Sequence, residues 1–424
     1  MDTHRVAVTG QGIVCSIGHD CEEFNSALKL GISGIDKLEN MNLEGLKVNV
    51  GAEVKSFSLS RYLLDKSYPV ELLSRVKSIM RRMPLMMETV VASALEAFYS
   101  AGLSYGVSAS DRMSVLIAGS NFSQNLHYRT ASRYSSSLEY LSPSYALQFF
   151  DTNFVGTLSE LFGVHGEGFT VGGASASGNA ALLQAYRLIK SGYADVCIVA
   201  SPMADFSPIE LQGFYNLGAM GGIRFEKDPK SACRPFDKDH EGFILGQGSG
   251  SLILESMESA KRRKVRVLAE IIGGSIVLDG NRLSDARVQG ETSAMLKALK
   301  DGDISLGDID YINAHGTSTP LGDEIELNAI KSIFKDEINR IWINSTKSLT
   351  GHCLFSAGIV EAIACIQQLN NGFIHPNLNL NCPIDSSFRF AGKQSTQANI
   401  HTAMSNSFAF GGINTSIILK RHES

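Results

Sequence analysis

The sequence predicts an α/β protein made of two interlocked halves. Apolar runs of strand length alternate along the chain with longer segments of helical periodicity. The 424 residues are nearly three times the ~150 of a typical domain, which favours more than one unit. The second half begins near Ser256, after a long loop rich in glycine and charge. We therefore expect one unit over residues 1–255 and another over residues 256–424.

Composition excludes several classes of function. The apolar share is 44% and the charged share 19%, as in ordinary globular proteins. With a net charge of −5, the chain lacks the overall positive charge that is typical of nucleic-acid-binding proteins. No apolar run approaches the ~20 residues of a membrane span, and the start lacks a signal-peptide core. Seven scattered cysteines without a CxxC pair favour reduced thiols, so we expect a cytoplasmic protein.

The first half shows its elements in a clear order. We expect strands at 5–14 (breaking at a glycine turn), 112–120, 168–173 and 194–202, helices at 86–103 and 177–193, and a loop over 218–250. The helix over 86–103 reaches Gly102 where it should stop, and the helix over 177–193 reaches Gly192.

The second half continues the alternation. We expect strands at 265–277, 309–316 and 342–348, a helix at 358–372, and two strands joined by a glycine turn within 400–420. Small residues and a glycine open a helix at 176–180 and again at 356–360. This echo hints at a duplicated unit, although small residues are common at helix starts.

The segment 172–178, Gly-Gly-Ala-Ser-Ala-Ser-Gly, lies between a predicted strand and a predicted helix. A side chain at its tip, such as Ser175, would sit near unpaired helix N–H groups, as in a nucleophile elbow. The segment departs from G-x-S-x-G because Ser177 replaces the last glycine. The alternative is a helix start whose serines only cap backbone N–H groups.

Two histidines follow predicted strands. His315 enters a loop of small and hydroxylated residues, and His352 follows Lys347 by five positions. A lysine beside a histidine keeps the imidazole neutral. Two neutral imidazoles converging on one carbonyl oxygen would form an oxyanion hole. The alternatives are a structural histidine and a solvated lysine; no zinc-ligand spacing occurs.

A glycine-rich turn at 406–414 is the last candidate segment. Its glycines would let backbone N–H groups approach a ligand, and Phe410 could gate an apolar pocket. Glycine-rich loops are common, so this pattern alone indicates little.

Together these segments resemble the β-ketoacyl-acyl-carrier-protein synthases, the condensing enzymes of fatty-acid and polyketide assembly. The resemblance runs almost end to end, from VAVTGQGIV to NSFAFGGINTS, and includes RPFDKDHEGFILGQGSG, NAHGTSTPLGDEIE and STKSLTGHCLFSAGIVEA. It implies a thiolase-like fold with five αβαβα layers made of two related halves. It also implies a homodimer, in which the strand GFTVGG pairs across the dimer axis.

The resemblance also implies roles for individual residues. His315 and His352 are the two catalytic histidines, Lys347 supports the second of them, and Glu361 is the buried family glutamate on the following helix. Phe410 would be the gating phenylalanine, and its N–H would form half of an oxyanion hole.

The substrate arm follows from the same resemblance. Thr317 and Thr319 would hydrogen-bond a phosphopantetheine arm, which an acyl carrier protein brings as its own group, so no cofactor is expected on this chain.

Ser175 is the decisive departure, because the family has cysteine at this position of A-C-x-S-G. Acyl loading needs a thiolate, and a serine alkoxide needs an adjacent base that the family histidines do not provide. Decarboxylation of a malonyl thioester needs only stabilisation of the enolate oxygen. Lesser departures are Gln247, where the family usually has glutamate, and Ala409, in place of the first glycine of G-F-G-G.

The narrower resemblance is to serine-for-cysteine synthase-like proteins of polyketide β-branching cassettes, which turn malonyl-carrier protein into acetyl-carrier protein. We therefore expect a malonyl-carrier-protein decarboxylase that performs no condensation. Two rivals remain open: a catalytically silent partner subunit of the chain-length-factor kind, and an acyltransferase or condensing enzyme with Ser175 as nucleophile.

Overall fold

A computed structural model describes residues 4–39, 45–81, 83–105 and 110–423. Eleven of its described strands form one mixed sheet in the order β13-β11-β10-β15-β16-β9-β1-β8-β6-β4-β5. The first half of the chain supplies β1 (Val6–Cys15), β4 (Met113–Ala118), β5 (Gly168–Val171), β6 (Val196–Ser201) and β8 (Gly248–Ser256). The second half supplies β9 (Ala269–Leu278), β10 (Tyr311–Asn313), β11 (Trp342–Asn344), β13 (Arg389–Phe390), β15 (Thr402–Ala409) and β16 (Ile413–Lys420).

The two groups of strands meet at one short junction. β1 pairs with β9 only over Val6–Val8, whereas it pairs with β8 along its whole length. Two small sheets complete the described strands: β2 (Asp36–Lys37) with β3 (Val50–Ala52) and β7 (Leu245–Gly246), and β12 (Phe373–Ile374) with β14 (Thr396–Gln397).

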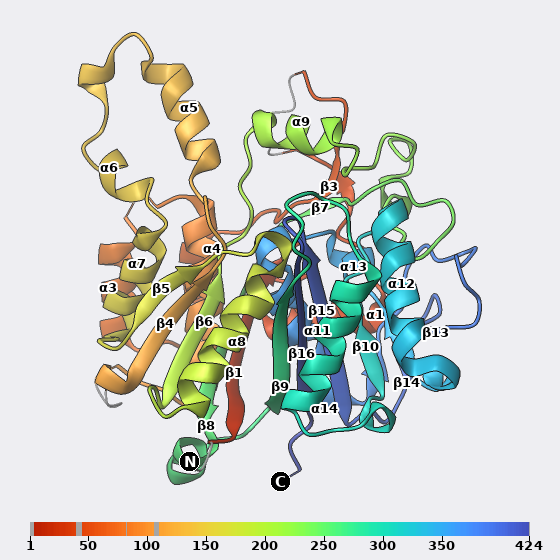
Figure 1. Cartoon of the computed structure of the whole chain (residues 1–424). Coiled ribbons are helices and arrows are strands. Elements are labelled where there is room, and N and C mark those ends of the chain that lie inside the picture. Colours follow the sequence, from red (N-terminus) through yellow and green to blue (C-terminus); the bar gives the residue numbers. More distant parts are fainter. Residues whose placement is uncertain (1–3, 40–44, 82, 106–109, 424) are drawn as a thin grey trace.

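Helices lie between and outside the two groups of strands (Figure 1). In the first half they are α1 (Cys21–Leu30), α2 (Leu59–Leu64), α3 (Val70–Ile79), α4 (Leu85–Ser100), α5 (Gln124–Tyr134), α6 (Tyr145–Gln148), α7 (Thr152–Phe162), α8 (Ser177–Lys190) and α9 (Pro208–Asn216). In the second half they are α10 (Met257–Arg263), α11 (Val288–Asp301), α12 (Pro320–Phe334), α13 (Lys347–Thr350) and α14 (Ala357–Asn371).

The packing gives five layers. α4 covers β1 and β8 on one outer side, and α11 covers β9 and β16 on the other, with α12 beside it. α8 and α14 pack against each other in the middle, α8 against β4 and β6 and α14 against β15. The αβαβα order expected from the resemblance is confirmed.

The two similar helix starts noted in the sequence occupy equivalent places in the two halves. Gly178 opens α8 and Gly358 opens α14, and a Cβ on Gly178 would lie 2.8 Å from the Gly358 Cα. Each helix follows a 3-10 turn that begins with a residue in the left-handed region, Ala174 (φ 46°) and Leu354 (φ 55°). The chain therefore repeats one strained turn and one helix start, and the two copies touch at their glycines.

The prediction that the first strand breaks at a glycine turn is wrong. β1 continues through Gly10 and Gly12, with only a bulge between Val8 and Gly10. A Cβ on Gly10 would lie 2.1 Å from the Ala97 carbonyl oxygen of α4, and one on Gly12 would lie 2.0 Å from the Ser93 carbonyl oxygen. These glycines serve the close approach of helix and strand, and not a turn.

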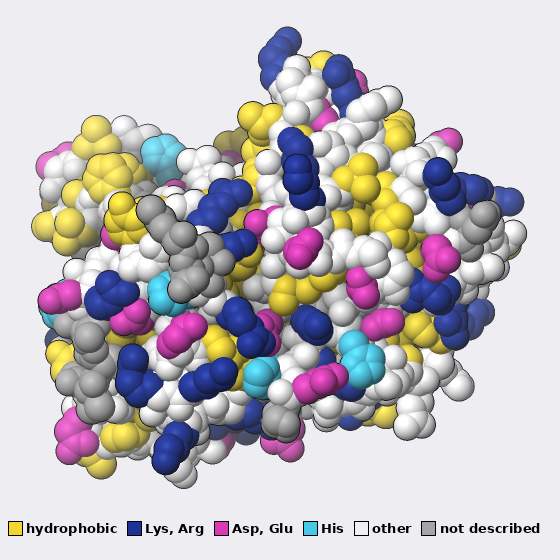
Figure 2. Space-filling view, turned by 60° about the horizontal axis from the view of Figure 1, so that its bottom comes forward, with side chains coloured by type: hydrophobic (Ala, Val, Ile, Leu, Met, Phe, Trp, Pro, Cys, Tyr) yellow, Lys and Arg dark blue, Asp and Glu magenta, His cyan; other side chains and the backbone are white. Residues whose placement is uncertain are grey.

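The expected loop over 218–250 is partly wrong as well. Its end belongs to β7 and to the start of β8, and all residues of β8 are buried. Among the described residues, no helix is both long and apolar enough to cross a membrane. On the face shown in Figure 2, basic and acidic side chains are intermixed.

Candidate active site

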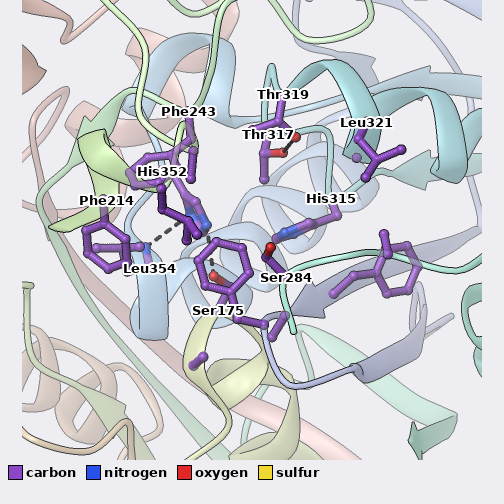
Figure 3. A pocket seen from close by; sticks show the side chains of 18 of the residues that line it. Ser175, Phe214, Phe243, Ser284, His315, Thr317, Thr319, Leu321, His352 and Leu354 are labelled. Atoms are coloured by element: carbon purple, nitrogen blue, oxygen red, sulfur yellow. Dashed lines mark hydrogen bonds between the residues drawn. The ribbon is translucent and has the colours of Figure 1, made fainter. Parts of the chain in front are cut away.

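A cavity of about 560 Å³ lies where residues from both halves of the chain meet. Six of the eight residues singled out in the sequence line it: Ser175, His315, Thr317, Thr319, His352 and Phe410. Figure 3 shows Ser175, His315 and His352 around this cavity, contributed by separate segments of the chain. The remaining two, Lys347 and Glu361, are buried beside the site and do not line the cavity.

Ser175 stands in the strained turn before α8. Ala174, directly before it, has φ 46°, and the turn presents the Ser175 Oγ 3.0 Å from the His352 Nε2. Ser177 holds this turn, because its Oγ accepts the Gly173 N–H and donates to the Ala174 carbonyl. The alternative of serines that cap the helix is not seen, since α8 has no side-chain cap hydrogen bond. Both serines border the cavity, but the Ser177 Oγ is used within the turn, whereas the Ser175 Oγ contacts His352.

The tautomer of His352 is assigned from its backbone contact. The Leu354 N–H donates to the His352 Nδ1 at 3.1 Å, so the neutral ring carries its proton on Nε2. The His352 N–H donates to the Ile244 carbonyl, which fixes the backbone of the residue. The Nε2–H then donates to the Ser175 Oγ. His352 is therefore placed as a hydrogen-bond donor to the cavity and not as a base for Ser175.

His315 has an equivalent arrangement. The Lys347 Nζ lies 3.3 Å from the His315 Nδ1 and 2.6 Å from its carbonyl oxygen. An ammonium group only donates, so Nδ1 accepts and the proton of the neutral ring stands on Nε2. Glu326 of α12 accepts the His315 and Gly316 N–H groups at 2.8 and 2.7 Å, which holds the loop after β10. Nε2 is the ring nitrogen left for the cavity.

Lys347 contacts a different histidine from the one that the resemblance implied. We expected it to support His352, but its Nζ contacts His315, because α13 starts at Lys347 and directs the side chain toward the end of β10. There it forms a buried ion pair with Glu361 of α14. The side chains are 1% and 2% exposed. Burial raises the pKa of Glu361 to about 7, against the opposing effect of the lysine.

Both imidazoles are held neutral by their surroundings. Burial is the first cause that lowers the pKa of His315 well below 6.5, followed by the charge of Lys347 and by the repulsion that a protonated His352 would exert. Burial and then Lys347 lower the pKa of His352 in the same direction. The ring centroids are 5.5 Å apart with nearly perpendicular planes. Two neutral donors therefore border one cavity, which is the geometry expected of an oxyanion hole.

Thr317, Thr319 and Phe410 lie at other parts of the cavity wall. The two threonine hydroxyls are 2.7 Å apart, and their loop is tied by the Ser318 N–H to Asp323. Phe410 is 39% exposed and stands in the turn between β15 and β16. This position suits a gate, and the roles of all three residues stay predictions.

The sequence analysis gave no role to Glu326, although it quoted the block that contains it. Glu326 lies eleven positions after His315, on a helix that starts at Pro320. The sequence analysis predicted no helix over 320–334, so it gave no signal that this glutamate faces inward. Gln247, a departure from the family pattern, is buried, accepts the Val54 N–H and donates to the Ala204 carbonyl. It does not line the cavity.

Comparisons with known proteins agree with this geometry. The family model "Beta-ketoacyl synthase, N-terminal domain" matches residues 3–260, and "Beta-ketoacyl synthase, C-terminal domain" matches residues 268–381. The chain is 37% identical over 419 residues to the polyketide biosynthesis malonyl-ACP decarboxylase PksF of Bacillus subtilis, covering 99% of this chain and 97% of that protein. It is 32% identical to the chloroplastic 3-oxoacyl-[acyl-carrier-protein] synthase I of Hordeum vulgare, covering 98% and 88%.

Solved structures show the same fold. A β-ketoacyl synthase from Burkholderia phymatum matches with a TM-score of 0.86 and 29% identity, covering 99% of this chain and 100% of that one. The type II ketosynthase AntDE, solved with its acyl-carrier protein AntF, matches with a TM-score of 0.86, 27% identity and the same coverage. The chain belongs to the β-ketoacyl synthase family and has its thiolase-like fold.

Proposed function

We propose that this protein decarboxylates malonyl-acyl-carrier protein to acetyl-acyl-carrier protein in polyketide biosynthesis, without condensation. One observation carries the proposal. His315 and His352 are both neutral and both carry their proton on Nε2, beside a serine where the family has its cysteine. The relative PksF, 37% identical over nearly the full length of both chains, is named for the same reaction.

The chemistry needs stabilisation of one oxygen. When CO₂ leaves, the bonding electron pair moves into the thioester, and negative charge develops on the carbonyl oxygen. Two Nε2–H donors from His315 and His352 meet this charge in a buried site. The His352 Nε2–H, which donates to the Ser175 Oγ without substrate, turns to the thioester oxygen when substrate is bound. One such donor typically contributes about 3–4 kcal/mol to the transition state. The donors need no proton transfer during this step.

Ser175 does not act as a nucleophile in this proposal. A serine needs a base that removes its proton, but the His352 Nε2 already carries a proton and donates to Ser175. No cysteine stands among the described residues that line the cavity. Cys353 follows His352 in the chain but is buried away from the cavity, and burial raises the pKa of its thiol. Acyl loading therefore has no competent group.

The silent-partner alternative has less support. A subunit that only shapes the pocket of another synthase has no need for two oriented donors. In this chain Lys347, Glu361 and Glu326 all hold the surroundings of His315 in place. We take this supporting set as evidence for an active oxyanion hole.

The substrate partner follows from the same reaction. We propose that an acyl carrier protein brings the malonyl group on its phosphopantetheine arm, and that Thr317 and Thr319 hydrogen-bond this arm. The homologous ketosynthase AntDE was solved with its carrier protein. We further propose a homodimer, since β5 is the last strand of the sheet and is partly exposed. Seven free thiols suit a reducing cytoplasm.

Incubation with malonyl-carrier protein, followed by mass spectrometry of the pantetheine arm, tests the proposal. We expect loss of 44 mass units, malonyl to acetyl, without a mass increase on the protein itself. Persistent malonyl would contradict the proposal. A stable acyl adduct on Ser175 would instead support the serine-nucleophile alternative.

A further inference from the structure

A fully buried carboxylic acid at the cavity has no assigned role. Glu291 lies on the first turn of α11, lines the cavity, and is 1% exposed. Its Oε2 is buried without a hydrogen-bond partner among the described residues. Buried polar groups are normally paired, so an unpaired one beside a substrate cavity calls for an explanation.

The surroundings of Glu291 favour its protonated form. Burial is the main cause that raises its pKa well above 4.5, and the carboxylates of Glu326, Asp279 and Asp323 add to the effect. Glu326 and Asp323 belong to α12, and Asp279 belongs to the segment that follows β9. A neutral carboxyl group has an O–H donor, which the neighbouring carboxylates lack when ionised.

The carboxyl groups near Glu291 differ from it in their contacts or their burial. Both oxygens of Glu326 accept backbone N–H groups. The Asp279 Oδ1 accepts the side-chain N–H of Asn414, and its Oδ2 has no partner among the described residues, but Asp279 is only half-buried. The Nε2–H groups of His315 and His352 are needed at the thioester oxygen. Among the described residues that line this cavity, Glu291 is therefore the carboxyl group that is both fully buried and left with an unpartnered oxygen.

Decarboxylation creates a need that condensation does not have. In a condensing enzyme, the enolate carbon attacks an acyl group and is consumed. In a decarboxylase, the same carbon must take a proton to become the methyl group of acetyl. We propose that Glu291 donates this proton, an inference that rests on the proposed function.

The step balances. The bond between C2 of the malonyl group and its carboxylate carbon breaks, CO₂ leaves, and the electron pair stays on the enolate. The enolate carbon then takes the Glu291 proton and forms a C–H bond. The resulting Glu291 carboxylate recovers a proton from water, so one proton from solvent is taken up per turnover.

Glu291→Gln is the first test, because the amide keeps the shape and loses the acidic proton. A positioned general acid contributes about 10²–10⁴-fold, so we expect kcat for acetyl formation to fall at least about 100-fold with little change in KM. Glu324→Gln is the matched control, since Glu324 is an exposed carboxylate on the neighbouring helix α12. Its kcat should match that of the unchanged protein.

Chemical rescue separates proton donation from a structural role. In Glu291→Ala, added formic or acetic acid should restore turnover in proportion to the concentration of the protonated acid, whereas a structural defect would not respond. If neither variant folds, the pH profile of the unchanged protein decides: kcat should fall on the alkaline side as Glu291 ionises.

The outcomes distinguish the two proposals. An unchanged protein that leaves malonyl intact contradicts the proposed function. An active unchanged protein with Glu291→Gln within threefold of it, or with a flat alkaline profile, contradicts only the proton-donor role.

Discussion

Replacing both partners of the Lys347–Glu361 pair should separate stability from activity. The pair is almost fully buried, and the Lys347 Nζ also contacts the His315 Nδ1. Glu361→Leu leaves an ammonium group buried without its carboxylate. Lys347→Met combined with Glu361→Leu removes both charges and keeps similar volumes.

The burial of the Lys347–Glu361 pair sets the size of the expected change in stability. Breaking a buried pair by removing one partner typically costs about 3–5 kcal/mol of the free energy of unfolding, whereas replacing both partners with apolar residues is often neutral. We therefore expect Glu361→Leu to lose about 3–5 kcal/mol and the double variant to recover most of it. The double variant should still decarboxylate slowly, because the His315 Nδ1 has lost its donor and Nε2 no longer reliably carries the proton. The loss in decarboxylation rate should not exceed the ~10²–10³-fold that one oxyanion donor contributes to kcat.

Urea unfolding followed by circular dichroism measures the stability, and acetyl-carrier-protein formation measures the activity. Lys331→Met is the control, since Lys331 pairs with Asp385 at the surface. The exposed pair should contribute at most about 1 kcal/mol. A Glu361→Leu variant as stable as this control would refute the buried-pair reasoning. A stable double variant with full activity would refute the positioning of His315.

Three further predictions concern the cavity. Ser175→Ala should lower the decarboxylation rate by no more than roughly tenfold, the effect of one neutral hydrogen bond. Ser175→Cys should gain an acyl adduct that mass spectrometry detects. An inactive alanine variant or a cysteine variant without an adduct would contradict the place of Ser175 in the nucleophile elbow. The double variant Thr317→Val, Thr319→Val should raise KM about fivefold or more, because each lost hydrogen bond costs about 1 kcal/mol of binding free energy. A change confined to kcat would argue against contact of the threonines with the substrate arm. The rate should stay level as pH falls through 6.5, because the lowered pKa values of His315 and His352 keep both rings neutral there. A midpoint near pH 6.5 in the acid limb that NMR titration assigns to the imidazole rings, and not to Glu361 with its pKa of about 7, would show that the rings titrate normally.

The sequence predicted the elements whose periodicity is set by burial. The helix over 86–103 and the helix over 358–372 correspond to α4 and α14, and the last two strands correspond to β15 and β16. The glycines in β1 and at the start of β8 were wrongly predicted to form a turn and a loop, because in these strands glycine allows close packing. Sequence cannot distinguish these two uses of glycine without knowing which helix lies opposite.

The candidate site was predictable where resemblance and local pattern agreed. Ser175, His315 and His352 came together as expected. The partner of Lys347 was not predictable, because it depends on how α13 is oriented against β10. Glu326 and Glu291 lie on helices whose inward faces only the packing of α11 and α12 defines. The division at residues 255 and 256 stays a prediction.

The account depends most directly on the two histidine donors. The decisive measurement is acetyl-carrier-protein formation from malonyl-carrier protein by the unchanged protein, His315→Ala and His352→Ala, read by mass spectrometry. Each substitution should lower the rate by about 10²–10³-fold, as for loss of one oxyanion donor, with the fold intact by circular dichroism. Turnover that persists unchanged in either folded variant would contradict the account.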